Sequence, residues 1–176
     1  MRKNIIKYGL ISGSIVVGIP TLAGLIIGHG PETFKIGEII GYSTMILSML
    51  IIFLAANEYQ KQNTQKNVGF KQIFAIGIGI SFIAGAMFGV YNVIYVTYIA
   101  PEFMDQYYQY YTDNIKNSGA PAAEISQQIK QIESEKEMFM NPLVNFLVMF
   151  ATVFVIGLIV SVISGFFQRD KNTQVS

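Results

Sequence analysis

Four long apolar runs, separated by polar segments, dominate the pattern of this chain. They cover residues 8–28, 39–56, 72–100 and 143–167, and none of them contains Asp, Glu, Lys or Arg. About 20 helical residues cross the roughly 30 Å hydrocarbon core of a bilayer. The pattern therefore predicts an all-α membrane protein with four transmembrane helices, organised as a single membrane domain over residues 1–176.

The first run has a second interpretation. Arg2, Lys3 and Lys7 precede it, as basic residues precede the apolar region of a secretory signal peptide. The run is longer than such an apolar region, so we favour a transmembrane helix. We expect a turn over residues 29–38 after it, and a polar connection over residues 57–71 between the second and third helices.

Residues 101–141 form the largest polar interruption, and its apolar positions follow a helical period. One stripe has spacings of four, three and four residues, and a second has spacings of four, three and seven. Because such a stripe buries one face of a helix, the pattern predicts two amphipathic helices that pack together as a helical hairpin. The predicted hairpin core comprises Met104, Tyr108, Tyr111, Ile115, Ile125, Ile129, Ile132 and Phe139.

Helix-terminating residues mark both ends of the second hairpin helix. Gly119 suits the left-handed position after a helix end, and Pro121 suits the first turn of a new helix. Asn141 can cap the fourth apolar helix, and Pro142 can open it. The hairpin is therefore predicted to turn at Gly119 and to re-enter the membrane at Pro142.

Small residues recur every four positions in the third and fourth apolar runs. Such stripes let membrane helices approach closely, where lipid supplies no hydrophobic drive for association. We expect the two helices to pack through them, with Gly77 level with Gly165 and Gly85 level with Gly157, so that Gly85→Leu weakens the fold. Glycine is also common in membrane helices generally, and a dimer contact is an alternative. The predicted packing residues are Gly77, Ser81, Gly85, Gly89, Gly157, Ser161 and Gly165.

Four membrane crossings place the polar segments on two sides of the membrane, and charged residues are distributed unevenly between these sides. The N-terminus, the second connection and the C-terminal tail hold eight basic and two acidic residues, whereas the first turn and the hairpin segment hold four basic and nine acidic residues. Segments rich in Lys and Arg stay in the cytoplasm. We therefore expect both termini in the cytoplasm and an extracytoplasmic hairpin.

Composition excludes several kinds of chemistry. Of the 176 residues, 13% are charged and 52% are hydrophobic, against about 25% charged in soluble domains. The chain has no cysteine, a single histidine (His29), and no His-Glu-x-x-His or Gly-x-Ser-x-Gly motif. No ionisable residue lies at the centre of an apolar run, although such residues mark proton and ion pathways. We therefore expect no catalytic residue, no metal site and no cofactor, in a protein that is not an enzyme.

Two features could indicate ligand binding, but each has a simpler interpretation. The hairpin segment holds seven acidic and three basic residues yet lacks a calcium-binding loop, so we favour solvated acidic faces and leave cation binding open. Tyr91, Tyr95 and Tyr98 recur near the end of the third apolar run, which is typical of the aromatic belt at a membrane surface.

Several short segments, by their order and spacing, carry a family resemblance. They are Gly69-Phe70, Ala100-Pro101-Glu102-Phe103, Lys116-Asn117-Ser118-Gly119, Lys136-Glu137-Met138-Phe139-Met140-Asn141-Pro142 and Gly157-Leu158-Ile159-Val160-Ser161. In these segments the chain resembles the four-helix bacterial membrane proteins of domain of unknown function 4199, over nearly its whole length. In that family helix four often carries a glutamate and a proline before the glycine, where this chain has Thr152 and Val155. The resemblance implies a bacterial inner-membrane protein and implies no activity.

Two classes of function remain. We favour a small structural or interaction protein whose external hairpin contacts a protein partner or a second copy. The alternative is a transport or permeation component of the inner membrane, which the lack of central charges disfavours. A membrane-embedded hydrolase is the weakest class, because no nucleophile with a base stands out. The lipid bilayer is an expected partner and nucleic acid is not, because no basic-aromatic module occurs.

Overall fold

Helices make up almost all of the structure. The computed structural model describes residues 1–28, 30–64 and 67–168, and these residues contain no strand, so the predicted all-α class is confirmed. A 3₁₀ turn at Pro31–Thr33 and a π-helical turn at Tyr95–Ile99 accompany the α-helices. The α-helices are α1 (Arg2–Ile27), α2 (Phe34–Met49), α3 (Ile51–Gln62), α4 (Phe70–Ile94), α5 (Phe103–Lys116), α6 (Ala122–Met140) and α7 (Pro142–Gln168).

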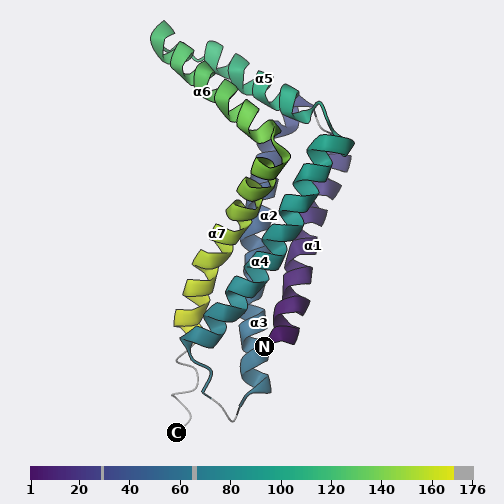
Figure 1. The fold of residues 1–176 in the computed structure, drawn as a ribbon, viewed down its shortest axis with the longest axis vertical. Coiled ribbons are helices and arrows are strands. Elements are labelled where there is room, and N and C mark those ends of the chain that lie inside the picture. The colour runs from purple at the N-terminus through teal and green to yellow at the C-terminus, as the bar shows by residue number, and fades with distance from the viewer. Residues whose placement is uncertain (29, 65–66, 169–176) are drawn as a thin grey trace.

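Four helical segments are long and apolar enough to cross a membrane. They are Arg2–Ile27, Pro31–Gln62, Phe70–Ile99 and Pro142–Gln168. Together they form an elongated bundle, and α5 and α6 project from one end of it at an angle (Figure 1). This is the architecture of a multi-pass membrane protein.

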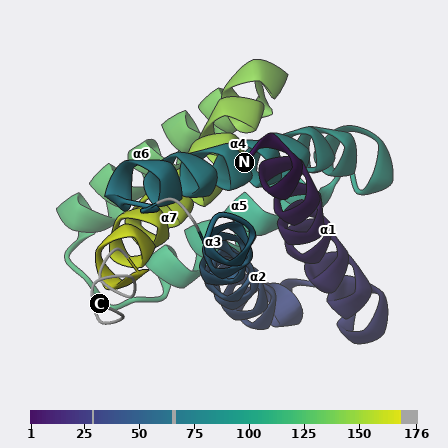
Figure 2. The ribbon, with the colours of Figure 1, turned by 90° about the horizontal axis from the view of Figure 1, so that it is seen from below.

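α4 organises the bundle. It packs along its length against α7 and on a second face against α1, while α2 and α3 close the remaining side (Figure 2). α1 and α4 run parallel, because Gly9 and Gly13 of α1 lie against Ile83 and Met87 of α4. The core between the helices contains the fully buried side chains of Val16, Met49, Ile52, Ile76, Ile80 and Val153.

The second membrane helix is longer than predicted and is interrupted once. The sequence predicted a helix over residues 39–56, whereas helical residues run from Phe34 to Gln62 with one turn residue between α2 and α3. The turn predicted over residues 29–38 is therefore wrong from Phe34 onward. The connection predicted over residues 57–71 is wrong up to Gln62 and again from Phe70, where α4 begins. Glu, Gln and Lys are good helix formers, so the helix continues where its apolar run ends.

The remaining boundaries differ less. α1 begins at Arg2 rather than at residue 8, because its basic first turns are compatible with a helix. The third span ends in a π-helical turn rather than in an α-helix. The predictions that concern His29, Lys66 and the tail over residues 169–176 lie outside the described residues.

A helical hairpin of α5 and α6 lies between the third and fourth candidate spans. α5 and α6 pack on each other, and Gly119 in the turn between them has φ +74°, the left-handed conformation that glycine adopts most readily. Asn141 caps α7, because its Oδ1 accepts hydrogen bonds from the backbone N–H groups of Leu143 and Val144 at 3.0 and 3.4 Å. α7 begins at Pro142, as predicted.

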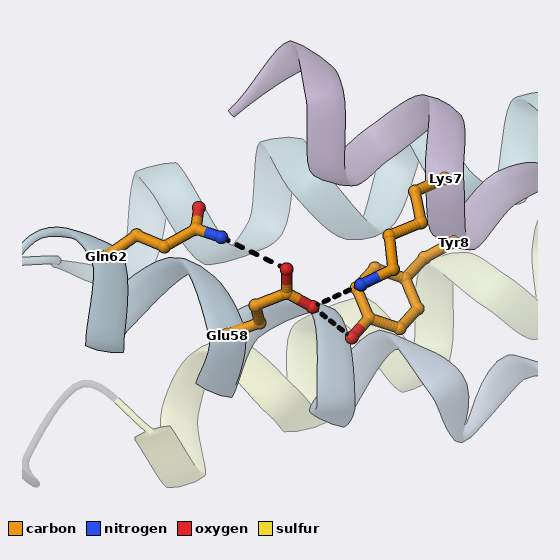
Figure 3. A network of polar contacts seen from close by, with 4 residues as sticks. All are labelled: Lys7, Tyr8, Glu58 and Gln62. Carbon is orange, nitrogen blue, oxygen red and sulfur yellow. Dashed lines mark hydrogen bonds and ion pairs between the residues drawn. The ribbon is translucent and has the colours of Figure 1, made fainter.

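A polar network joins α1 to α3 at the end of the bundle opposite the hairpin (Figure 3). Lys7 Nζ lies 2.8 Å from Glu58 Oε2, and the Tyr8 hydroxyl donates to the same oxygen. The Gln62 amide donates to Glu58 Oε1 at 3.0 Å. Three donors thus converge on one carboxylate, which holds the polar extension of α3 beside α1.

Candidate functional site

An apolar cavity of about 700 Å³ lies at the hairpin end of the bundle. α1, α2, α4 and α7 form its walls, and residues of α5 and α6 complete them. Its lining is mostly apolar and includes Met45, Phe88 and Met149. Ligand pockets are commonly clefts of this size, lined by apolar side chains and a few convergent polar groups. The cavity is therefore the candidate functional site.

Glu38 of α2 joins the bundle to the hairpin at this cavity. The hydroxyls of Tyr107 and Tyr111 each donate a hydrogen bond of 2.6 Å to Glu38 Oε1. The two tyrosines lie four residues apart on α5 and therefore share one helix face. Burial, followed by the hydrogen bond to Glu38, raises the pKa of Tyr107, and the same two causes raise the pKa of Tyr111. Both hydroxyls therefore remain protonated donors at neutral pH.

An aromatic cluster surrounds this junction. Phe34, in the first turn of α2, is buried, and its ring centroid lies 5.6 Å from those of Phe103, Tyr107 and Tyr110. Aromatic pairs in edge or tilted geometry contribute about 0.5–1.5 kcal/mol beyond the area they bury. The base of the hairpin is thus fixed to α2 by ring contacts as well as by hydrogen bonds.

Tyr108 is the most buried residue of the hairpin and lines the cavity. Its side chain is 8% exposed, and burial, followed by the charge of Glu135, raises its pKa to about 12. Glu135 of α6 lines the same cavity, together with Ile132 and Phe139. The hairpin therefore contributes both apolar and acidic groups to the site.

A hydrogen-bonded pair, Thr21 and Tyr91, and the amide of Asn145 also belong to the cavity lining. Thr21 Oγ1 of α1 is hydrogen-bonded to the Tyr91 hydroxyl of α4 at 2.8 Å. Asn145 of α7 is 1% exposed, and its amide nitrogen donates to the Phe139 carbonyl oxygen at 3.5 Å. Asn145 Oδ1 has no hydrogen-bond partner among the described residues, although a buried amide oxygen normally has one. Asn145 is thus a lining residue with a buried, unpaired acceptor.

The charged groups of the lining are acidic. Glu38 and Glu135 line the cavity, and no Lys, Arg or His occurs among the described residues of its lining. In the described part of the chain, no three or more His, Cys, Asp or Glu side chains gather into a group that could hold a metal ion. The arrangement can accept hydrogen bonds and attract positive charge at one end of an apolar chamber.

The residues predicted for helix packing lie along the contact between α4 and α7. A Cβ atom on Gly77 would collide with Ser161 Oγ, and a Cβ atom on Gly157 would collide with Ser81 Oγ. These glycines therefore allow the two backbones to approach closely. The remaining glycines of the stripes face phenylalanine residues, in the pairs Gly85–Phe150, Gly89–Phe146 and Gly165–Phe70.

The predicted register between these helices is wrong by about one helical turn. Gly77 lies opposite Ser161 rather than level with Gly165, and Gly85 lies opposite Phe150 rather than level with Gly157. The physical reason is space filling: each glycine receives a larger group from the facing helix, whereas facing glycines would leave a gap without dispersion contacts.

The predicted hairpin-core residues occupy the less exposed positions of α5 and α6. All eight are buried or half-buried, while most residues around them are exposed. Tyr111 contributes differently from the expectation, because its hydroxyl binds Glu38 of α2. Lys136, which interrupts the second stripe, pairs with Asp105 of α5 at 2.6 Å and so links the two hairpin helices.

Sequence reasoning missed three residues of the site. It placed Phe34 and Glu38 in a turn, and it left Tyr107 outside the hairpin stripe. One signal was available: Phe103, Tyr107 and Tyr111 recur at four-residue intervals beside the predicted stripe. Two adjacent apolar stripes on one helix indicate that it packs against two neighbours.

Comparison with known proteins identifies the family of the chain. The family model described as "Protein of unknown function (DUF4199)" matches residues 7–170. No curated protein and no solved structure matches the chain. The family match covers most of the sequence, including most of each of the four apolar helices. The chain therefore belongs to the DUF4199 family of proteins of unknown function.

Proposed function

We propose that this protein is a non-catalytic interaction protein of the bacterial inner membrane. Its transmembrane helices anchor it in the bilayer with both termini in the cytoplasm. Its hairpin of α5 and α6 then stands outside, where it contacts a protein partner or a second copy of the chain.

The observation that carries this proposal is the construction of the hairpin. It projects from the bundle as a pair of packed helices (Figure 1), and its base is held by the Glu38 hydrogen bonds and the Phe34 contacts. Its distal turn, residues 116–119, is exposed. An arm fixed in this way loses little conformational entropy on binding, which favours affinity.

Charge supports an extracytoplasmic arm and indicates the kind of partner. The hairpin segment holds seven acidic and three basic residues, whereas the segments at the other end of the bundle are rich in Lys and Arg. Complementary charge steers association, so a basic protein surface fits the exposed faces of α5 and α6 best.

Truncation of the arm tests the proposal. Replacement of residues 114–124 by a short Gly-Ser linker removes the distal turn and leaves Tyr107, Tyr111 and the Lys136–Asp105 pair in place. We expect the full-length chain to co-purify with a stoichiometric partner, or to form dimers, after gentle solubilisation, and the truncated chain to do neither. The double variant Lys3→Gln, Lys61→Gln, altered at the opposite end of the bundle, is the control and should retain the partner.

A partner or dimer that persists after truncation would contradict the proposal. The cavity favours a second candidate function, a transport or permeation component, because it provides space between the helices. A flux in reconstituted vesicles that survives the same truncation would support that second function.

A further inference from the structure

We propose that the cavity beneath the hairpin binds a lipophilic amine, that is, an apolar chain or ring system that carries one protonated amino group. The amino group would lie at the hairpin end, near Glu38, and the apolar part would lie deeper among the helices. This inference concerns the cavity and does not depend on the hairpin as a partner-binding arm.

The apolar lining determines the larger part of the ligand. The cavity of about 700 Å³ is lined mainly by carbon, with Met45, Phe88 and Met149 in its walls. It lies between helices that are long and apolar enough to span the hydrocarbon layer, and apolar compounds partition into that layer. A chamber of this kind selects molecules that are mostly apolar.

The charges of the lining determine the sign of the head group. Glu38 and Glu135 are the charged residues among the described lining, and both are acidic. An anionic head group would find no basic side chain among these residues and would be repelled by two carboxylates. A positive head group would be attracted by them and by the faces of the surrounding tyrosine rings.

The unmatched acceptors determine the hydrogen-bonding type of the head group. Tyr107 and Tyr111 both bind Glu38 Oε1, and Glu38 Oε2 has no hydrogen-bond partner among the described residues. Asn145 Oδ1 is likewise without a partner in the described part of the chain, in a side chain that is 1% exposed. Asn145 Oδ1 is itself shielded from solvent, so Glu38 Oε2 is the acceptor available to a ligand, and that ligand supplies N–H or O–H donors. A protonated amine combines donors with positive charge.

Tyr107 and Tyr111 fix the position of the carboxylate. Two charge-assisted hydrogen bonds to one oxygen restrict the rotation of the Glu38 side chain and leave its other oxygen available. The carboxylate therefore meets the ligand in a prepared geometry, which reduces the entropy cost of binding. We assign Glu38 as the residue that selects for positive charge.

Binding of three probes with the same tail tests the proposal. Full-length protein in nanodiscs of phosphatidylcholine is titrated with decylammonium, decanol and decyl sulfate, and bound ligand is counted by native mass spectrometry against empty nanodiscs. We expect one saturable decylammonium per chain, bound at least about tenfold more tightly than decyl sulfate. Equal affinities for the two charged probes, or no saturable binding, would overturn the proposal.

Two variants, each of which neutralises one carboxylate, test whether Glu38 causes the preference for the positively charged probe. Glu38→Gln should weaken decylammonium binding at least about tenfold and change decanol binding little, because only the charge contact is lost. Glu32→Gln removes an acid from the turn before α2 that is not part of the cavity lining, and it should change neither affinity. Unchanged decylammonium binding in Glu38→Gln would refute the assignment, and the comparison of probes in the unaltered protein remains decisive if this variant does not fold.

A third variant separates this inference from the proposed function. The chain with residues 114–124 replaced by a linker keeps the hairpin residues that line the cavity, so it should bind decylammonium as the full-length chain does. Loss of the partner together with retained amine binding is the expected pair of results. A phospholipid that occupies the cavity and is not displaced by decylammonium would count against the proposal.

Discussion

At the scale of single residues, Glu38 links the bundle to the hairpin. It accepts hydrogen bonds from two tyrosines of α5, and Phe34 packs against the same helix. Two hydrogen bonds from one face of α5 to a single carboxyl oxygen hold that helix against α2. The position of the hairpin relative to the bundle therefore depends on a few side chains at its base.

Removal of one hydroxyl at this junction should destabilise the protein. Tyr107→Phe deletes a donor to Glu38 and keeps the ring, so we expect a loss of about 1–2 kcal/mol in the free energy of unfolding. Tyr110→Phe is the matched control, because Tyr110 contacts Phe34 through its ring. Thermal unfolding of both variants in one detergent measures the difference, and equal melting temperatures for the two would refute this role for the hydroxyl.

The raised pKa of Tyr108 predicts that the stability of the protein falls at alkaline pH. Its pKa is raised by burial from 10.0 to about 12, so the folded protein holds a proton that the unfolded chain releases. The associated stability is complete below pH 10.0 and is lost as the pH rises toward about 12. Tyr107 and Tyr111 also titrate late, so the absorbance of tyrosinate during an alkaline titration should lose the contribution of one late-titrating group in Tyr108→Phe. A variant whose titration curve matches that of the parent protein in this range would contradict the assignment.

At the scale of elements, the contact between α4 and α7 shows how membrane helices combine small and large residues. Ser81 and Gly157 face each other, as do Gly77 and Ser161, and the other stripe glycines face phenylalanine residues. Each helix thus provides both recesses and the groups that fill them. The dispersion attraction between these fitted surfaces replaces the hydrophobic effect, which is weak between helices in lipid.

Gly85 and Gly18 form a matched pair that tests this packing. A Cβ atom on Gly85 would lie 2.9 Å from the backbone oxygen of Phe150, which cannot move without moving α7. Gly85→Ala should therefore cost about 1–3 kcal/mol of stability. Gly18→Ala places its methyl group in open space within α1 and should be neutral or stabilise the helix by up to about 1 kcal/mol. Similar melting temperatures for the two variants in detergent would show that α4 and α7 do not pack in this way.

At the scale of the whole molecule, acidic and basic residues concentrate at opposite ends of the bundle. The acidic hairpin occupies one end of the bundle, and the Lys7–Glu58 network lies at the other end, beside the basic N-terminus. The positive-inside rule favours a cytoplasmic location for the basic end. The proposed topology thus makes the exposed turn of the hairpin accessible from outside the cell.

Cysteine labelling tests this topology directly, because the chain has no cysteine of its own. Ser118→Cys lies in the exposed turn of the hairpin, and Thr64→Cys lies in an exposed position after α3. In intact spheroplasts, a membrane-impermeant maleimide should label the first variant and spare the second until the membrane is opened. The reverse pattern would invert the proposed orientation.

The sequence by itself determined the features that local physics controls. Apolar runs long enough to span a bilayer predicted four membrane helices, and Gly119, Asn141 and Pro142 predicted a turn, a cap and a helix start that the structure contains. These signals lie within a few residues of one another. Backbone conformation and hydrogen bonding act over the same short range.

Only the tertiary structure decided which faces meet. The bonds from Tyr107 and Tyr111 to Glu38 join residues 69 and 73 positions apart, and no period in the sequence relates them. The register of α4 on α7 and the cavity likewise depend on how side chains of different helices fill the space between them. Periodicity shows that a helix has an apolar face, but complementary volumes and hydrogen-bonding groups choose its neighbour.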